Sequence, residues 1–310
     1  MHSGGLDIGG TKIEARLFAP DLSVLASHRI PTPRDLPGFV AALAAQIGWL
    51  RDRAAQPDLP VGIAIPGIPD PVSGRVTAAN LPIDGENLPA LLARAGGGVL
   101  PVVVDSMALA LSEANGGAGD GARVVCGLVF GTGLGAGLCI DGALPPRHGG
   151  LGVEIGHTGL PARALARHDL PLWRCGCGRD GCLEAYLSGP ALVRLAQWAG
   201  LAHTDAPALA QAAAGGDKAA QRVLAIWVDL AAECVDLLQL ALAPEVVVLG
   251  GGLSNLPDIA PRLAQAHAAR ALPNTRAPAI RLARHGDASG ARGAAIAARQ
   301  AARAGGKRAG

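Results

Sequence analysis

The chain has 310 residues, half of them apolar, and its 27 basic and 25 acidic residues leave a formal net charge of +2. This balance, without a basic block, argues against a nucleic-acid-binding surface, and the length suits two domains of about 150 residues. The most apolar run, 223–249, contains three acidic residues and a proline. We therefore expect a buried helix and a strand there, since a membrane span needs about 20 apolar residues. The N-terminus lacks a signal-peptide pattern, so we expect a cytoplasmic protein.

Alternating strand and helix patterns along the chain predict an α/β fold. Residues 4–18 indicate two short strands around a glycine turn, and this pattern recurs at 130–140, which suggests two related halves. Further strands are expected at 60–65, 100–104, 123–130, 135–141 and 245–249, and helices at 39–53, 88–95, 107–113, 188–198, 206–215 and 218–242. The glycine-rich stretch 115–121 is the expected domain boundary, and the last residues, with Arg303, Lys307 and Arg308, indicate a short solvated tail.

Three glycine-rich segments each follow an apolar strand. They are Asp7-Ile8-Gly9-Gly10-Thr11-Lys12, Gly131-Thr132-Gly133 and Gly250-Gly251-Gly252. Glycines let backbone N–H groups approach phosphate oxygens, and ligands of open α/β sheets bind beyond the carboxyl ends of strands. In the first segment, Thr11 and Lys12 add side-chain donors, and the Asp7 carboxylate suits Mg²⁺. Each segment alone could be a plain turn, but the three together favour a nucleotide site. A strand-like stretch follows Gly133, which argues against a Rossmann dinucleotide turn.

Three cysteines, Cys175, Cys177 and Cys182, lie within eight residues of one another. Such spacing is typical of a metal site, and a structural zinc takes four Cys or His ligands in a closed tetrahedron. His157 is the best fourth ligand, and His148 and His168 are alternatives that spacing leaves open. The remaining cysteines, Cys126, Cys139 and Cys234, lie singly in apolar runs, so we expect buried and inert thiols.

Three acidic residues are candidates for sugar chemistry. Asp105 ends an apolar strand before a helical stretch, and on residue chemistry alone a helix N-cap is favoured over a catalytic base. Glu154 and Glu184 lie close in sequence to the proposed zinc ligands. Because a zinc-braced loop would hold both rigidly, the pair suits a grip on neighbouring sugar hydroxyls, although each alone could be a surface glutamate.

Five segments resemble, in order, the ROK family of sugar kinases and repressors. They are 7–12, 131–133, Glu154-Ile155-Gly156-His157, 175–184 and 248–254. The cysteine element after Glu-x-Gly-His is the most specific of them, and the resemblance covers about residues 6–298. The long gap between His157 and Cys175, together with 31–35 and 283–288, resembles the bacterial N-acetylglucosamine kinases in particular.

The resemblance implies a two-domain actin-like ATPase (ribonuclease H-like) α/β fold with an interdomain cleft. The N-terminal domain would comprise residues 1–118 plus about 290–310, and the C-terminal domain, 119–289, would carry the zinc loop and a homodimer surface. ATP with Mg²⁺ would lie on the glycine loops, and a sugar, most simply N-acetylglucosamine, would be phosphorylated at its 6-hydroxyl. The implied partners are the sugar, ATP and a second copy of the chain, without nucleic acid or membrane.

The resemblance also implies residue roles. Asp105 falls at the family's catalytic base, which reverses the cap interpretation. The positions that hold sugar hydroxyls in the family correspond to Glu154, His157 and Glu184, with Gly67 and Asn80 on other sugar-side loops. The family's structural zinc ligands correspond to His157, Cys175, Cys177 and Cys182.

One departure concerns the residues around Asp105, where the family has Asn-Asp-Ala-Asn and this chain has Val104-Asp105-Ser106-Met107. Val104 cannot donate the hydrogen bond that the first Asn gives the sugar, a loss of about 0.5–1.5 kcal/mol. We expect an active kinase with weaker or altered sugar preference. Glucose, mannose or fructose as substrate, polyphosphate as donor, and a sugar-binding protein without catalysis stay open. A ROK repressor is disfavoured, because the phosphate loop already begins at Asp7.

Overall fold

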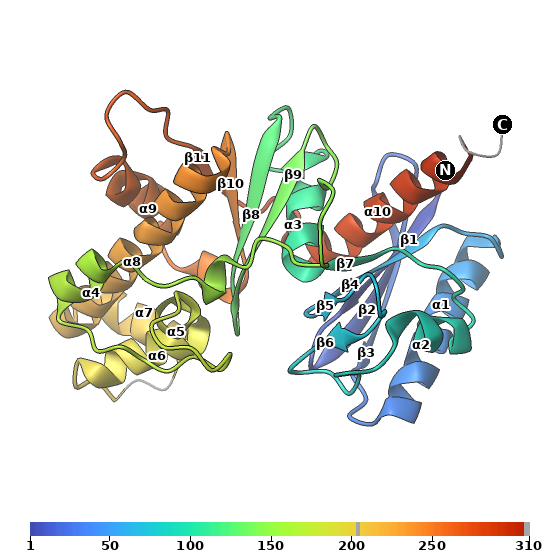
Figure 1. Cartoon of the computed structure of the whole chain (residues 1–310), viewed down its shortest axis with the longest axis horizontal. Coiled ribbons are helices and arrows are strands. Elements are labelled where there is room, and N and C mark those ends of the chain that lie inside the picture. The colour runs from blue at the N-terminus through green and yellow to red at the C-terminus, as the bar shows by residue number, and fades with distance from the viewer. Residues whose placement is uncertain (203–204, 307–310) are drawn as a thin grey trace. The chain divides into compact units, whose positions relative to one another are not determined.

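The computed structural model describes residues 1–202 and 205–306 and forms two compact units (Figure 1). Unit 1 comprises residues 1–117, 142–152 and the described residues from His285 onward, and unit 2 comprises 118–141 and 153–284. Residues 142–152 and 285–289, expected in the second domain, therefore belong to unit 1. Among the helices of the described residues, none is both long and apolar enough to cross a bilayer.

Unit 1 is built on a five-stranded sheet with the order β3-β2-β1-β4-β7. Strand β1 (Ser3–Ile8) pairs antiparallel with β2 (Lys12–Phe18) and parallel with β4 (Val61–Ile65), which in turn lies parallel to β7 (Val102–Val104). Strand β3 (Val24–Pro31) forms the other edge, and β5 (Ile68–Pro69) and β6 (Val76–Thr77) form a separate small hairpin.

Side chains of β1 alternate between the two faces of this sheet, as strand geometry requires. Leu6 and Ile8 belong to one buried cluster with Phe39 and Leu43 of α1 (Leu36–Ala54), and α2 (Leu88–Arg94) adds further leucines. The Asp35 side chain caps α1 by accepting the Gly38 N–H at 2.8 Å.

The opposite face is covered by α10 (Ser289–Gly306), which runs along the sheet and packs on α3 (Asp105–Ala114) (Figure 1). Glycines make this contact possible. A Cβ at Gly5 would lie 1.8 Å from the Ala291 carbonyl oxygen, and one at Gly62 would lie 2.0 Å from that of Ala294. The helix therefore rests directly on the backbone of β1 and β4. The short 3-10 turn η3 (Gly286–Ala288) leads into it.

Unit 2 contains a four-stranded sheet with the order β11-β10-β8-β9. Strand β8 (Val124–Phe130) pairs antiparallel with β9 (Leu134–Ile140) and parallel with β10 (Val246–Gly250), which lies parallel to β11 (Ala279–Leu282). The order β9-β8-β10-β11 repeats the order β2-β1-β4-β7 of unit 1, with one antiparallel hairpin followed by parallel neighbours.

The core of unit 2 surrounds the long helix α8 (Lys218–Leu242), whose Trp227 is fully buried and lies edge-on to Phe130 at 5.1 Å. The other helical elements are η1 (Ile155–His157), α4 (Ala162–His168), α5 (Glu184–Leu187), α6 (Gly189–Trp198), α7 (Ala206–Ala214), η2 (Gly252–Asn255) and α9 (Ile259–Ala268).

The elements expected from sequence are all present, with boundaries shifted by at most a few residues, and 218–242 is matched end to end. Eight strands and α-helices of the described residues were not predicted: β3, β5, β6, α4, α5, α9, β11 and α10. The expected tail is corrected at Arg303, which lies exposed within α10, whereas Lys307 and Arg308 fall outside the described residues.

Candidate functional site

The first glycine turn joins β1 to β2, and its shape is set by three hydrogen bonds. The Gly9 N–H donates to the Lys12 carbonyl at 2.8 Å. From the end of β3, the Thr32 hydroxyl donates to the Gly9 carbonyl at 2.6 Å, and the Thr32 N–H donates to the Thr11 carbonyl at 3.1 Å. Gly10 and Thr11 at the tip are exposed, so their backbone groups are accessible to a ligand.

The Asp7 carboxylate lies directly behind this turn, at the end of β1 and against the start of α10. A Cβ at Gly290 would fall 2.5 Å from Asp7 Cγ. The pKa of Asp7 is raised to about 6, chiefly by burial and next by the charge of Asp105, while the charge of Lys12 acts in the lowering direction. The structure thus brings Asp7, near the end of β1, close enough to Asp105, directly after β7, for the two charges to interact.

The Lys12 side chain, at the end of the first glycine turn, lies between two carboxylates. Its Nζ lies 3.5 Å from Asp287 Oδ2 and 3.9 Å from Glu14 Oε2. Glu14 is buried and also accepts from Arg29 Nη2 at 2.7 Å and from Arg16 Nη2 at 2.7 Å. The ammonium group is therefore held beside the turn, and its ion pair with Asp287 is weak because the Asp287 side chain is largely exposed.

Asp105 is the first residue of α3, and Val104 occupies the cap position without a side-chain cap bond. Asp105 Oδ1 accepts the Ser106 N–H at 2.6 Å. Val104 and Met107, which replace the two asparagines of the family pattern, are buried.

The other two sugar-side candidates of unit 1 lie on loops. Gly67 lies between β4 and β5, close to the Thr77 carbonyl, and the exposed Asn80 follows β6. A Cβ at Gly10 would lie 3.1 Å from the Asn80 carbonyl oxygen, so Asn80 is adjacent to the first turn.

The second glycine turn joins β8 to β9 and meets the third glycine cluster. Gly251 has φ +81°, and a Cβ there would lie 2.4 Å from the Phe130 carbonyl oxygen, so this position requires glycine. The Gly189 N–H, at the start of α6, donates to the Gly131 carbonyl at 2.7 Å. The third glycine cluster thus touches the start of the second glycine turn through Gly251.

Glu184, expected to bind sugar, also contacts this turn. Its Oε2 accepts the Leu134 N–H at 2.9 Å, and its Oε1 lies 3.8 Å from Cys175 Sγ. Glu154 is partly exposed and immediately precedes η1, which carries His157.

Four side chains of unit 2 form a metal-ligand cluster. The donor atoms of His157, Cys175, Cys177 and Cys182 all lie within 4.8 Å of one another. Cys177 Sγ and Cys182 Sγ are 3.6 Å apart, and His157 Nδ1 and Cys175 Sγ are 3.9 Å apart. Two thiolates bound to one tetrahedral zinc at about 2.3 Å each would be separated by about 3.8 Å. The residues present therefore fit a tetrahedral ion.

Backbone pairing shapes this cluster. The Cys175 N–H donates to the Arg179 carbonyl at 2.8 Å, closing the cysteine loop, and the Leu183 N–H donates to the Thr158 carbonyl at 2.9 Å, placing Cys182 beside His157. A backbone N–H donated by Arg179 lowers the pKa of the Cys177 thiol, whereas burial raises the pKa of Cys182 to about 12. The alternative ligand His148 is exposed in unit 1, and neither it nor His168 belongs to the cluster.

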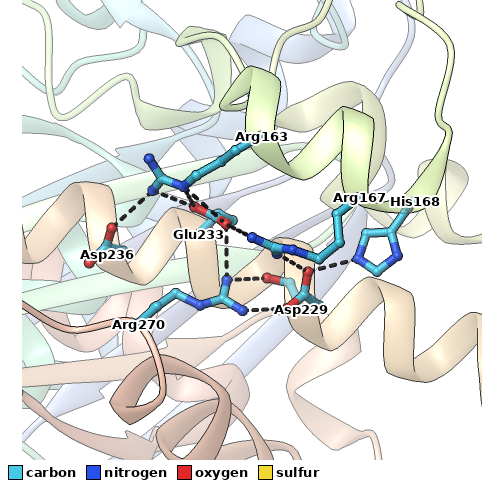
Figure 2. Close-up of polar contacts among 7 residues, drawn as sticks. All are labelled: Arg163, Arg167, His168, Asp229, Glu233, Asp236 and Arg270. Carbon is cyan, nitrogen blue, oxygen red and sulfur yellow. Dashed lines mark hydrogen bonds and ion pairs between the residues drawn. The ribbon is translucent and has the colours of Figure 1, made fainter.

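The segment between His157 and Cys175 is fastened to α8 by a charged network (Figure 2). Glu233 is fully buried, accepts from Arg163 Nη2 at 2.7 Å and lies 3.3 Å from Arg167 and 3.4 Å from Arg270. His168 Nε2 lies 2.7 Å from Asp229, which also pairs with Arg167 and Arg270, while Arg163 reaches Asp236 at 3.2 Å. This network holds α4 against α8, and it thereby fixes the segment between His157 and Cys175 that leads into the cysteine loop.

Sequence reasoning did not single out Thr32, Glu14 or Asp287 as parts of the site. Each acts through a tertiary contact, on the first turn or on Lys12, and no local pattern signals such a contact. The other cysteines, Cys126, Cys139 and Cys234, are buried as expected, and burial raises the pKa of the Cys126 thiol to about 12.

Two α/β units with the same strand order, each with a glycine turn in the corresponding hairpin, define an actin-like ATPase fold. The chain belongs to the ROK family, whose pattern matches residues 3–301. It is 39% identical to the N-acetylgalactosamine kinase AgaK of Shewanella sp. (strain ANA-3) over 94% of this chain and 95% of that protein. It is 38% identical to an N-acetyl-D-glucosamine kinase of Escherichia coli O1:K1 over 94% and 97%, respectively. Among solved structures, the ROK hexokinase of Thermus thermophilus superposes with a TM-score of 0.86 at 31% identity, covering 98% of this chain and all of that one.

Proposed function

We propose that this protein is an ATP-dependent kinase that phosphorylates an N-acetylhexosamine, in the first place N-acetyl-D-glucosamine, at its 6-hydroxyl. The family and the two curated relatives, both kinases of N-acetylated hexosamines, support the reaction class. The observation that carries the proposal is the pair Asp7 and Asp105 behind a turn whose Lys12 supplies a cation. Phosphoryl transfer needs a carboxylate for Mg²⁺ and a base for the attacking hydroxyl, and this pair supplies both.

In unit 1, Asp105 accepts the proton of the sugar 6-hydroxyl, and Asp7 holds Mg²⁺ directly or through water. Gly9, Gly10 and Thr11 offer donors to phosphate oxygens, and Lys12 exchanges Asp287 for a phosphate. Gly67 and Asn80 lie on loops assigned to the sugar. Mg²⁺, when bound with ATP, would neutralise negative charge on the two phosphates whose shared bond breaks in the reaction.

In unit 2, residues 131–133 and 250–252 offer backbone groups to the nucleotide. Glu154, His157 and Glu184 accept or donate hydrogen bonds to sugar hydroxyls, where carboxylates give the stronger, charge-assisted bonds. We assign ATP as the phosphate donor. We also assign a homodimer as the assembly, and light scattering during size-exclusion chromatography would test its mass. A cytoplasmic location stays a prediction.

We further propose that His157, Cys175, Cys177 and Cys182 bind one structural Zn²⁺. Four protein ligands leave no coordination position open, so the ion braces the loop instead of activating water. Elemental analysis should give one zinc per chain for the wild type and much less for Cys177→Ser, whose thiol is exposed and whose loss leaves the core intact. Equal zinc content in both would contradict the assignment.

The choice of sugar rests on few contacts, since the sugars named for the two relatives differ only in the configuration at one ring carbon. Val104 occupies the position of a sugar-binding Asn, and we attribute to it a weaker or altered sugar preference. Val104→Asn should therefore lower the KM for the preferred sugar several-fold. An unchanged KM for every sugar would remove Val104 from the account of specificity.

The test of function is a coupled ADP-release assay on zinc-replete protein with N-acetylglucosamine, N-acetylgalactosamine, glucose, mannose and fructose. One sugar should stimulate ADP release, and Asp105→Asn should lower kcat by at least about 100-fold, the effect of losing a general base. Met107→Leu serves as a control in the same helix, because it changes a buried neighbour and no charge. Folded, zinc-loaded protein that no sugar stimulates would instead favour a sugar-binding protein without catalysis.

A further inference from the structure

Leu134, the residue that ends the second glycine turn and begins β9, is contacted from two directions. Its N–H donates to Glu184 Oε2 at 2.9 Å. Its carbonyl is approached by Gly156, where an added Cβ would lie only 2.1 Å from the oxygen. Both polar groups of one peptide residue at the turn are thus touched by other segments of unit 2.

Both segments lead directly into the metal-ligand cluster. Gly156 immediately precedes His157 in η1, and Glu184 follows Cys182 by two residues at the start of α5. The same Glu184 carboxylate lies 3.8 Å from Cys175 Sγ through its other oxygen. Whatever fixes the four ligand side chains therefore also fixes the two groups that touch Leu134.

The turn itself contributes little to its own order. Gly131, Thr132 and Gly133 supply one short hydroxyl side chain, and Thr132 is exposed. Within the turn, the Gly131 N–H donates to the Gly133 carbonyl at 3.0 Å. The opposite end is held by the Gly189 N–H, which comes from the same stretch of chain as Glu184. The backbone donors of the turn are thus oriented from outside, between Glu184 and Gly189.

We infer that Glu184 is a positioning residue that couples the metal cluster to the β8–β9 turn, so that metal binding orders the backbone groups that receive the nucleotide. This role is separate from the contact of Glu184 with sugar, and its effect on nucleotide binding rests on the proposed function. The coupling is mechanical. A bound ion would hold His157 and Cys182, and these two residues would in turn fix Gly156 and Glu184, which contact Leu134.

Two variants separate the positioning role from the sugar contact. Glu184→Gln keeps an oxygen that accepts the Leu134 N–H but loses the negative charge, whereas Glu184→Ala loses both. Binding of the ATP analogue AMP-PNP with Mg²⁺, measured by calorimetry without sugar, should be within about twofold of wild type for Glu184→Gln. It should be about tenfold weaker for Glu184→Ala, the effect of one charge-assisted hydrogen bond. Thermal melts confirm that both are folded.

A second measurement follows the turn without any ligand. Hydrogen exchange of the Leu134 amide in zinc-loaded protein should be slow in wild type and Glu184→Gln and about tenfold faster in Glu184→Ala. Removing zinc with a chelator should accelerate the wild-type amide by a similar factor and change Glu184→Ala much less, because the link is already cut.

The outcomes distinguish this inference from the function it rests on. If zinc removal leaves Leu134 exchange in wild type unchanged, or if Glu184→Ala exchanges and binds AMP-PNP as wild type does, the coupling is wrong. The same holds if Glu184→Gln is impaired as much as Glu184→Ala. If no form binds AMP-PNP while the exchange pattern holds, the coupling stands and the assignment of nucleotide to this turn fails.

Discussion

The β1–β2 and β8–β9 turns hold equivalent positions in two sheets of the same strand order, yet they are ordered by different means. The first has charge around it: Asp7 behind, Lys12 at its exit and buried Glu14 beyond. The second consists of Gly131, Thr132 and Gly133 alone, and its order comes from Glu184, Gly189 and Gly251.

This difference indicates that the two equivalent glycine turns have different roles. A turn flanked by carboxylates and an ammonium group can hold a metal ion and stabilise charge during phosphoryl transfer. A neutral glycine turn offers only backbone donors, whose usefulness depends on fixed geometry. We therefore propose that the first turn takes part in the chemistry and that the second positions the nucleotide, which would make the second turn dependent on the framework of unit 2.

The largest expected effect tests that framework at Glu233, which is fully buried and pairs with three arginines in the network drawn in Figure 2. Glu233→Gln removes the charge that compensates them and should lower the free energy of unfolding by about 3 kcal/mol. Urea denaturation measures this loss. Asp141→Asn, which breaks an exposed ion pair with Arg123, is the control and should leave the urea midpoint unchanged. Equal midpoints for the two variants would show that the network does not stabilise α4 on α8.

Gly251→Ala tests the second turn directly. The new Cβ would overlap the Phe130 carbonyl at a backbone angle that L-residues avoid, so we expect a cost of about 3 kcal/mol and weaker AMP-PNP binding. Gly252→Ala is the matched control, since its Cβ would meet no heavy atom within 4 Å among the described residues. If both variants melt and bind like wild type, the third glycine cluster does not support the turn.

Asp7→Asn tests the charged turn, and its effect on stability should be opposite to its effect on activity. Because the folded pKa of about 6 exceeds the ordinary value of 3.8, ionising Asp7 weakens the fold as pH rises through this window. The variant should therefore be more stable than wild type at pH 7, by on the order of 2 kcal/mol, and equal to it below about pH 4. It should also lose Mg²⁺-dependent activity. Thermal melts from pH 3.5 to 7.5 measure the difference, and a wild type more stable at pH 7 would contradict the burial argument.

Thr32→Val is expected to have the smallest effect. It removes the hydroxyl that donates to the Gly9 carbonyl and should raise the KM for ATP about five- to tenfold, the equivalent of about 1 kcal/mol, with little change in kcat. Thr32→Ser keeps the hydroxyl and should behave like wild type. A loss in kcat without a change in KM would place Thr32 in the chemical step instead of in loop positioning.

Sequence patterns predicted those parts of the molecule whose signals are local. The strands around both glycine turns, helix α8 and the three-cysteine part of the metal cluster depend on periodicity, glycine position or ligand spacing, which can be recognised along the chain, whereas spacing alone left the fourth ligand open. Helix α10 was not predicted, because the face that packs on the glycines of β1 and β4 is mostly alanine and also buries Arg292 and Arg299, so it lacks a stripe of large apolar residues. Strand β3 is mostly exposed, so it lacks the alternation that identifies a half-buried strand.

The site was predictable to the same extent. The glycine turns and the cysteine ligands can be identified from their spacing in the sequence. Asp105, in contrast, was interpreted as a helix N-cap until the resemblance to the family suggested a catalytic base. Thr32 and Glu184 act on turns 23 and 50 residues away in sequence, respectively. Such contacts form only when the strands pair and the helices pack, so they cannot be inferred from the type of a single residue or from its neighbours in sequence.

The division of work between the two turns can be tested most directly through the magnesium dependence of AMP-PNP binding. Calorimetry with and without Mg²⁺ should show a large gain in affinity from the ion in wild type and in Glu184→Ala, although Glu184→Ala binds more weakly under both conditions. Asp7→Asn should show almost no gain from Mg²⁺. If Asp7→Asn keeps the gain, or Glu184→Ala loses it, then the charged turn does not hold the metal and the account of the two turns is wrong.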